Sequence, residues 1–299
     1  MHSTTALATS LMRAVHTRLD DHPLIEDLWG DRLVSESART SLLHAALSTM
    51  DPQTRANALL SPGTVIDGWL RRSPAYANVI LRTRFAEDAL KTAVARGIRQ
   101  YVLVGAGFDS FALRRPAFAA DLQIFEIDSP ATQNFKRARI AECGVSLSSS
   151  LHFIAADLSQ ETLSAALARS AFDPRVLSLF SWLGVTVYLS REANLSTFRS
   201  IAACSPLGSE VVFTYMDKRV FAVQPQAFRE MQDRVAAVGE PFISGFNPSA
   251  LAEDLEACGL RLIEDLTGSD AAARYGRLGE NSLGRSSFSH IALARVMIG

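Results

Sequence analysis

The feature that most constrains the fold is an alternation of short apolar runs with helical stretches, which begins near residue 98. Each run is almost continuously apolar, as strands buried on both faces of a parallel sheet require. The alternation predicts an α/β fold with a doubly wound, mostly parallel sheet of seven strands and the first strand near its centre. The expected strands are Tyr101–Val104, Leu122–Ile127, Leu151–Ile154, Val176–Phe180, Val211–Thr214, Leu260–Glu264 and His290–Ile298; the expected helices are Asn134–Cys143, Gln160–Ala168 and Arg191–Cys204. We find no clear crossover helix in the short gap before the last strand, so that strand is predicted to be antiparallel.

The segment before this alternation reads as helical. Leu7, Leu11 and Val15 recur every fourth residue and share one helix face, and a further helix fits Ala77–Ala95, closed by Gly97. We expect residues 1–97 to form a helical cap that covers the substrate, and residues 98–299 to form the α/β domain. A helical lid insertion is expected at about 217–248.

Composition excludes several classes of protein. The 299 residues contain 30 Lys and Arg against 31 Asp and Glu, a net charge of −1, with no basic stretch, so a nucleic-acid partner is not expected. The N-terminus has no signal-peptide pattern, and no apolar run is long enough to span a bilayer. The three cysteines lie far apart and the histidines have no metal-ligand spacing. We therefore expect a cytoplasmic protein, monomeric or homodimeric, with no metal and no membrane association.

The glycine-rich exit from the first strand constrains the ligand. Gly105 and Gly107 let a ligand approach the backbone closely. A dinucleotide-binding loop has a third glycine where this chain has Ser110, and Asp109 stands where a pyrophosphate would approach. Because a carboxylate repels phosphate and attracts a cation, the loop favours a nucleoside that carries positive charge and no phosphate.

Acidic residues follow the next two strands. Glu126 and Asp128 close the second strand and suit ribose hydroxyls, and Asp157 follows the third, where it suits the amino group of adenine. The carboxyl ends of parallel strands share one sheet edge, so these acids are expected to form one site for S-adenosylmethionine. Alternatively, Asp157 is only a helix N-cap.

The chain resembles, over nearly its whole length, the leucine carboxyl methyltransferase-like family of S-adenosylmethionine-dependent methyltransferases, which includes bacterial polyketide O-methyltransferases. The stretches that carry the resemblance are SLMRAVHTRLDDHPLIED, LRTRFAEDAL, YVLVGAGFDS, IFEIDSPATQNFKRARI, AADLS, WLGVTVYLS and GEPFISGFNPSALAEDLEACG. It implies the class I methyltransferase fold, Rossmann-like, and S-adenosyl-L-methionine as cofactor.

The resemblance also implies roles for residues. Arg82, rather than Arg84, would hold the methionine carboxylate, although pairing of Arg84 with Asp88 on its own helix is the simpler reading of that residue. The other implied or candidate cofactor-binding residues are Gly105, Gly107, Asp109, Glu126, Asp128, Asp157, Leu158 and Ser181. Family members often have a glutamate five residues before the tyrosine of the Tyr-Leu pair, where this chain has Leu183.

The expected reaction is O-methylation of a carboxylate or hydroxyl on a small, polyketide-like molecule. Tyr188 is the candidate on the acceptor side, and Trp182 and Phe108 either line an apolar pocket or belong to the core. Two alternatives stay open: an NAD-dependent oxidoreductase, and a catalytically degenerate methyltransferase fold that acts as a binding protein.

Overall fold

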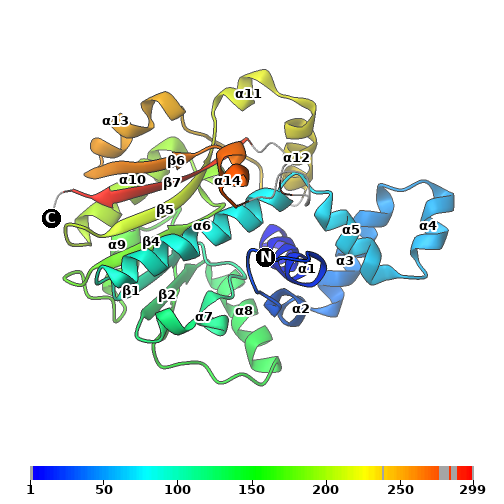
Figure 1. The fold of residues 1–299 in the computed structure, drawn as a ribbon, viewed down its shortest axis with the longest axis horizontal. Helices are drawn as coiled ribbons and strands as arrows, with labels where there is room; N and C mark the ends of the chain where they lie inside the picture. Colours follow the sequence, from blue (N-terminus) through cyan, green and yellow to red (C-terminus); the bar gives the residue numbers. More distant parts are fainter. Residues whose placement is uncertain (1–2, 238, 276–282, 284–287, 298–299) are drawn as a thin grey trace.

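A seven-stranded sheet forms the centre of the computed structural model, which describes residues 3–237, 239–275, 283 and 288–297 (Figure 1). The strand order is β3-β2-β1-β4-β5-β7-β6; β1 to β5 pair in parallel, and β7 pairs antiparallel with both its neighbours. The strands are β1 (Gln100–Val104), β2 (Gln123–Asp128), β3 (Leu151–Ala155), β4 (Ser178–Trp182), β5 (Glu210–Met216), β6 (Leu260–Leu266) and β7 (Ser289–Val296). The predicted doubly wound fold, its central first strand and its antiparallel last strand are confirmed. Ile298, the predicted end of that strand, lies outside the described residues.

In the described residues before β1, the chain forms six helices. They are α1 (Thr4–Leu19), α2 (Trp29–Leu33), α3 (Glu36–Ser48), α4 (Pro52–Ala58), α5 (Pro62–Arg71) and α6 (Tyr76–Ala95). Helices α3, α4 and α5 project to one side as an arm, while α6 crosses the face of the sheet (Figure 1). Gly97 adopts a left-handed conformation, φ +105°, just after α6, and the chain then turns into β1.

The remaining helical elements lie between and beside the strands. They are α7 (Phe111–Arg114), η1 (Ala117–Ala119), α8 (Pro130–Glu142), α9 (Leu163–Ala168), η2 (Thr186–Tyr188), α10 (Arg191–Ala203), α11 (Arg219–Val223), α12 (Gln226–Ala237), η3 (Pro248–Ala250), α13 (Leu251–Glu256) and α14 (Gly268–Tyr275). Three local expectations were wrong. Helix α8 begins at Pro130, before the expected Asn134, because Ser129 provides its N-cap. Helix α9 begins at Leu163, because residues 157–161 form a turn and Thr162 provides the N-cap. Helix α14 lies between the last two strands, where no helix was expected; its eight residues are too few to show a helical period.

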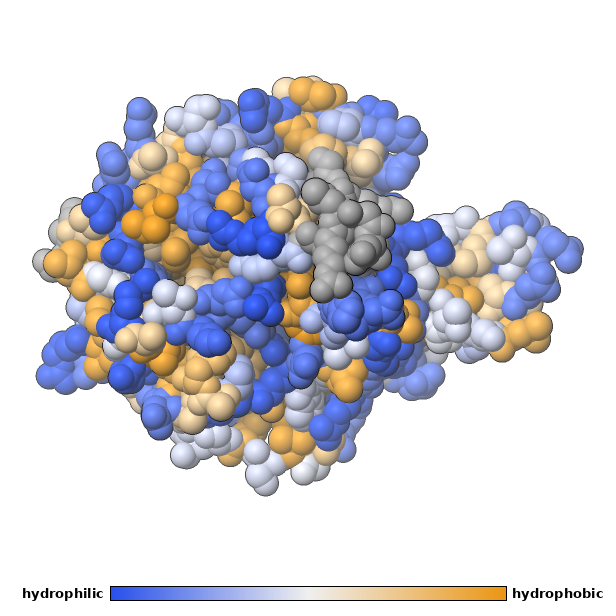
Figure 2. Space-filling model, viewed as in Figure 1, coloured by the Kyte–Doolittle hydropathy of each residue, from blue (hydrophilic) through white to orange (hydrophobic). Residues whose placement is uncertain are grey.

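The two faces of the sheet bury separate cores, as the alternation of side chains along a strand requires. Tyr101 and Leu103 of β1 pack with the N-terminal helices, α6 and α8, whereas Val102 and Val104 pack with α9, α10 and α13. The N-terminal helices therefore share one continuous apolar core with the sheet. On the face drawn in Figure 2, hydrophilic and apolar residues are interspersed. Within the described residues, no helix is long and apolar enough to cross a membrane.

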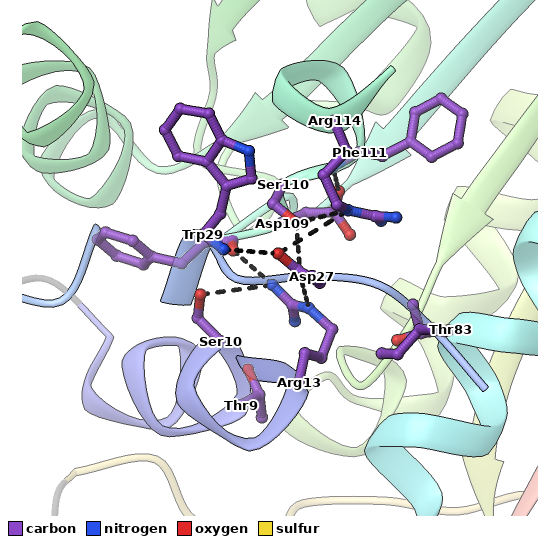
Figure 3. A network of polar contacts seen from close by, with 12 residues as sticks. Thr9, Ser10, Arg13, Asp27, Trp29, Thr83, Asp109, Ser110, Phe111 and Arg114 are labelled. Atoms are coloured by element: carbon purple, nitrogen blue, oxygen red, sulfur yellow. Dashed lines mark hydrogen bonds and ion pairs between the residues drawn. The ribbon is translucent and has the colours of Figure 1, made fainter. Parts of the chain in front are cut away.

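A buried ionic network joins the N-terminal segment to the glycine-rich loop after β1 (Figure 3). Asp27, which is fully buried, accepts hydrogen bonds from Arg13 Nε at 2.7 Å and Ser110 Oγ at 2.6 Å, and Arg114 lies 3.8 Å away. Arg13 also donates to the carbonyl oxygen of Phe108 at 2.7 Å. Burial acts to raise the pKa of the Asp27 carboxyl, yet the two arginines and Ser110 hold it below its usual value. This network fixes α1 to the loop.

Asp27→Asn should lower the free energy of unfolding by about 3–5 kcal/mol at pH 7, because it leaves Arg13 buried without its counter-ion. The native pKa of Asp27 is depressed, so its contribution is present above the unfolded-state pKa and is lost as pH falls through the native pKa. The difference between wild type and variant in urea titrations should therefore shrink below about pH 4. Asp31→Asn, which removes a partly exposed partner of Arg18 and Arg39, is the control and should change stability by less than about 1 kcal/mol. An equally small effect of Asp27→Asn would contradict the structural role of the network.

Candidate functional site

A cavity of about 440 Å³ lies at the carboxyl edge of the sheet. Its floor is the loop 105–109 after β1, with Asp128 from the end of β2 and Ser181 from β4. Side chains of α1 and α6 and the segment 239–243 complete its walls. The volume falls within the ~300–1,000 Å³ typical of small-molecule sites, and the position is where open α/β sheets bind ligands.

The glycine loop gives this cavity a floor of bare backbone. Gly105 has φ +70°, and a Cβ built there would lie 2.5 Å from Cγ2 of Val185, so only glycine fits. Gly107 donates its backbone N–H to Oδ2 of Asp128 at 2.6 Å, and the N–H of Ser129 donates to Oδ1 at 2.7 Å. Burial raises the pKa of Asp128, and these two bonds oppose the rise. Asp128 thus shapes the loop and retains lone pairs for a ligand.

Asp109 and Ser110, at the end of the loop, differ in their orientation. Asp109 lines the cavity, and its Oδ1 accepts the N–H of Phe111 at 2.7 Å. Ser110 is fully buried and bonds instead to Asp27, on the side of the N-terminal segment (Figure 3). Ser110 stands where a dinucleotide-binding loop has its third glycine. Here its side chain links the loop to α1 through Asp27 and Arg13.

Arg82 of α6 enters the cavity without a carboxylate partner among the described residues. Its Nη1 donates to Oδ1 of Asn78 at 3.2 Å, and its head packs against Gly184, where a Cβ would lie 2.6 Å from Nη1. Burial lowers the pKa of Arg82 to about 10, so the guanidinium is still charged at neutral pH. Two residues further along the helix, Arg84 points elsewhere and pairs with Asp88 at 3.0 Å, as the simpler reading predicted.

A second cavity, of about 130 Å³, adjoins the first. The two share Arg82, Gly184 and Tyr188, together with threonines of α1. Its walls are mainly apolar and include residues of α12, such as Met231, and Phe242 from the segment that follows. Burial raises the pKa of the Tyr188 phenol to about 12, a nearby carboxylate of Glu240 adds to the rise, and Arg82 opposes it. Tyr188 is thus a protonated hydrogen-bond donor at neutral pH, placed where the cavities meet.

Four of the predicted site residues do not line either of these cavities: Arg84, Glu126, Asp157 and Leu158. Glu126 is buried and forms an ion pair with Lys136 of α8 at 2.5 Å; burial raises its pKa to about 7, and Lys136 opposes the rise. The Asp157 side chain is exposed and caps the following turn by accepting the N–H of Ser159 at 3.0 Å. Leu158 packs on the core beneath α9. Contacts of these residues with a ligand stay predictions.

Of the two aromatic candidates, Phe108 borders the first cavity and Trp182 does not. Trp182 is fully buried and packs edge-on against Phe198, with ring centroids 5.2 Å apart, so it belongs to the core. Phe108 is almost fully buried but borders the first cavity. Leu183 also lines that cavity, so the position at which the resemblance implied a frequent glutamate presents an apolar side chain there.

Several lining residues were missed from the sequence. Arg13, Thr5 and Thr9 come from α1, far along the chain from the glycine loop, and no local pattern distinguishes them. Glu240 lies in the stretch GEPFISGF, where an acid between glycine and proline was the one available signal. In the described part of the chain, no group of three or more His, Cys, Asp or Glu side chains is placed to hold a metal ion.

Comparison with known proteins identifies the family of this chain. The family model described as leucine carboxyl methyltransferase matches residues 6–202. Two proteins named "Putative S-adenosyl-L-methionine-dependent methyltransferase" are similar: YktD of Bacillus subtilis (strain 168), 29% identical over 90% of this chain and 89% of its own length, and one from Mycolicibacterium smegmatis, 30% identical over 73% and 68%. In fold, the chain resembles the crystal structure of a DUF574 family protein from Streptomyces avermitilis, with TM-score 0.57 and 16% identity, over 89% of this chain and 99% of that one. This chain belongs to the leucine carboxyl methyltransferase family of S-adenosylmethionine-dependent methyltransferases.

Proposed function

We propose that this protein transfers the methyl group of S-adenosylmethionine to an oxygen atom of a small molecule. The observation that carries the proposal is Arg82: a half-buried guanidinium with one neutral partner, Asn78, facing a cavity whose floor is a glycine loop. A charge that is largely removed from water is unfavourable without a counter-ion, so a ligand that supplies a carboxylate would complete this site. The methionine end of the cofactor has one.

The residues present fit the cofactor. Arg82 would form charge-assisted hydrogen bonds to its carboxylate, and the bare backbone at Gly105 and Gly107 would let its ribose approach. The Asp128 carboxylate is held by hydrogen bonds from two backbone N–H groups, and it would accept a further hydrogen bond from a ribose hydroxyl. When bound, S-adenosylmethionine supplies a methyl group already activated by the sulfonium. The protein then has mainly to align the acceptor and exclude water.

The second cavity supports a small acceptor. At about 130 Å³ it approaches the size of an engineered apolar cavity, of roughly 150 Å³, that holds benzene, so it would take one ring or a short alkyl portion of a polyketide-like molecule. Helix α12 covers it and would keep water away. Because the pKa of Tyr188 is raised, its phenol would orient the acceptor oxygen by donating a hydrogen bond rather than remove a proton. A carboxylate and a hydroxyl remain the two acceptor classes.

The alternatives have less support. An NAD-dependent oxidoreductase needs space and charge for a pyrophosphate, but Asp109 lines the floor and Ser110 is engaged by Asp27. A binding protein without activity would bind the cofactor and transfer no methyl group. Incubation with labelled S-adenosylmethionine and a panel of phenols and aryl carboxylates, with released S-adenosylhomocysteine as the readout, tests for transfer.

Arg82→Gln should weaken S-adenosylhomocysteine binding by about 10- to 100-fold, because a hydrogen bond to a charged group is worth roughly 1.5–3 kcal/mol. The matched control is Arg84→Gln, on the same helix but paired with Asp88, and it should leave the dissociation constant unchanged. Isothermal titration calorimetry measures both. The apo Arg82→Gln protein should be at least as stable as wild type, since it loses a half-buried charge that has no ionic partner among the described residues. Equal effects of the two variants on binding would count against the proposal.

S-adenosylhomocysteine should protect the wild-type protein against thermal unfolding, by about 2.7 kcal/mol at a concentration of 100 times its dissociation constant. NADH at the same concentration should give no shift, because Asp109 repels its pyrophosphate. Differential scanning calorimetry is the measurement. Protection by NADH alone would favour the oxidoreductase.

A further inference from the structure

A carboxylate that the proposed function does not use lies in the wall of the first cavity. Glu240 follows α12, and its backbone N–H donates to the carbonyl oxygen of Val235 at 2.9 Å. Just beyond it, the N–H groups of Ile243 and Ser244 both donate to the carbonyl oxygen of Val187, at 2.7 and 3.2 Å. Hydrogen bonds on both sides therefore hold Glu240 at the cavity, beside Tyr188.

The Glu240 carboxylate has an unsatisfied hydrogen-bond acceptor. Its Oε2 is shielded from solvent and has no hydrogen-bond partner among the described residues, and Glu240 forms none of their ion pairs. Leaving a buried polar atom unsatisfied costs about 1–3 kcal/mol, and more for a charged group. Such an atom is expected where a ligand completes the site.

Glu240 and Arg82 form a complementary arrangement. Both line the same cavity, and each lacks an oppositely charged partner within the described residues. They do not pair with each other, and Tyr188 experiences the charge of both. The cavity therefore presents one positive group and one negative group, both near this tyrosine. A ligand with a carboxylate and a cation a few atoms apart would satisfy both.

We infer that Glu240 binds the positive charge of the methionine portion of S-adenosylmethionine, its ammonium or its sulfonium group, while Arg82 binds the carboxylate. The inference rests on the proposed function. It assigns to the segment after α12 a part in holding the cofactor, while α12 itself covers the acceptor cavity. In this arrangement Glu240 provides the negative charge for the cation. Leu183, which lines the same cavity, is apolar and provides none.

Binding of three ligands that differ in their charged groups shows which cation Glu240 contacts. S-adenosylmethionine has both cations, S-adenosylhomocysteine has only the ammonium, and 5′-methylthioadenosine has neither cation nor the carboxylate. Glu240→Gln should weaken binding of S-adenosylmethionine about tenfold or more in isothermal titration calorimetry, and leave 5′-methylthioadenosine within about twofold of wild type. An equal loss for S-adenosylhomocysteine would assign the ammonium as the partner; no loss for it would assign the sulfonium. Glu240→Asp, which keeps the charge, should lose less than Glu240→Gln.

The matched control is Glu230→Gln, which removes the same charge from an exposed position on α12. It should change none of the three dissociation constants. Unchanged binding of S-adenosylmethionine and S-adenosylhomocysteine by Glu240→Gln would overturn the inference, and so would a comparable loss for 5′-methylthioadenosine, which would mark a general disturbance of the site. If the wild-type protein binds none of the three, the proposed function itself fails, and the inference with it.

Discussion

The arrangement of the site depends on one buried carboxylate, Asp27. It lies in the connection between α1 and α2, and it binds Arg13 of α1 and Ser110 of the glycine loop. Arg13 in turn holds the carbonyl oxygen of Phe108. A buried charge is tolerated only with well-placed partners, so this network allows few relative positions of α1 and the loop. Helices α1 and α6 consequently form part of the cavity wall, and apolar side chains of the N-terminal helices continue the core of the sheet.

Two charged side chains at the cavity, Arg82 and Glu240, have no ionic partner in the described structure. Most buried charges here are paired, as Glu126 is with Lys136 and Asp27 with Arg13. Arg82 and Glu240 differ because each faces the cavity without an ionic partner in the described structure. Such groups lower stability in the free protein and are characteristic of binding sites, where a ligand completes them. Gly184 contributes to this arrangement, because a side chain at that position would collide with the Arg82 guanidinium.

Much of the fold was predictable from local patterns. Near-continuous apolar runs identified all seven strands, although their bounds moved by one or two residues. Helix α14 was missed because it is short, and α9 began later than expected because Thr162 rather than Asp157 caps it. Within the site, the glycine loop, Asp109, Asp128 and Arg82 were found from the sequence and do line the cavity. Their contacts with the cofactor stay predictions.

What the sequence determined by itself is the set of properties that periodicity and backbone chemistry encode: which segments are strands, where the first strand must end in glycine, and which edge of the sheet has the acids. What only the tertiary structure decided is which charged groups reach the cavity. Glu126 and Asp128 lie on the same face of one strand, yet α8 covers the first with Lys136 while the second, at the end of the strand, remains at the edge. Arg82 and Arg84 are two residues apart on one helix, so they point to different sides, and only packing determines which of them faces the cavity. Arg13 and Glu240 lie far apart in the sequence, and no local pattern predicts that long-range packing brings them to the same cavity.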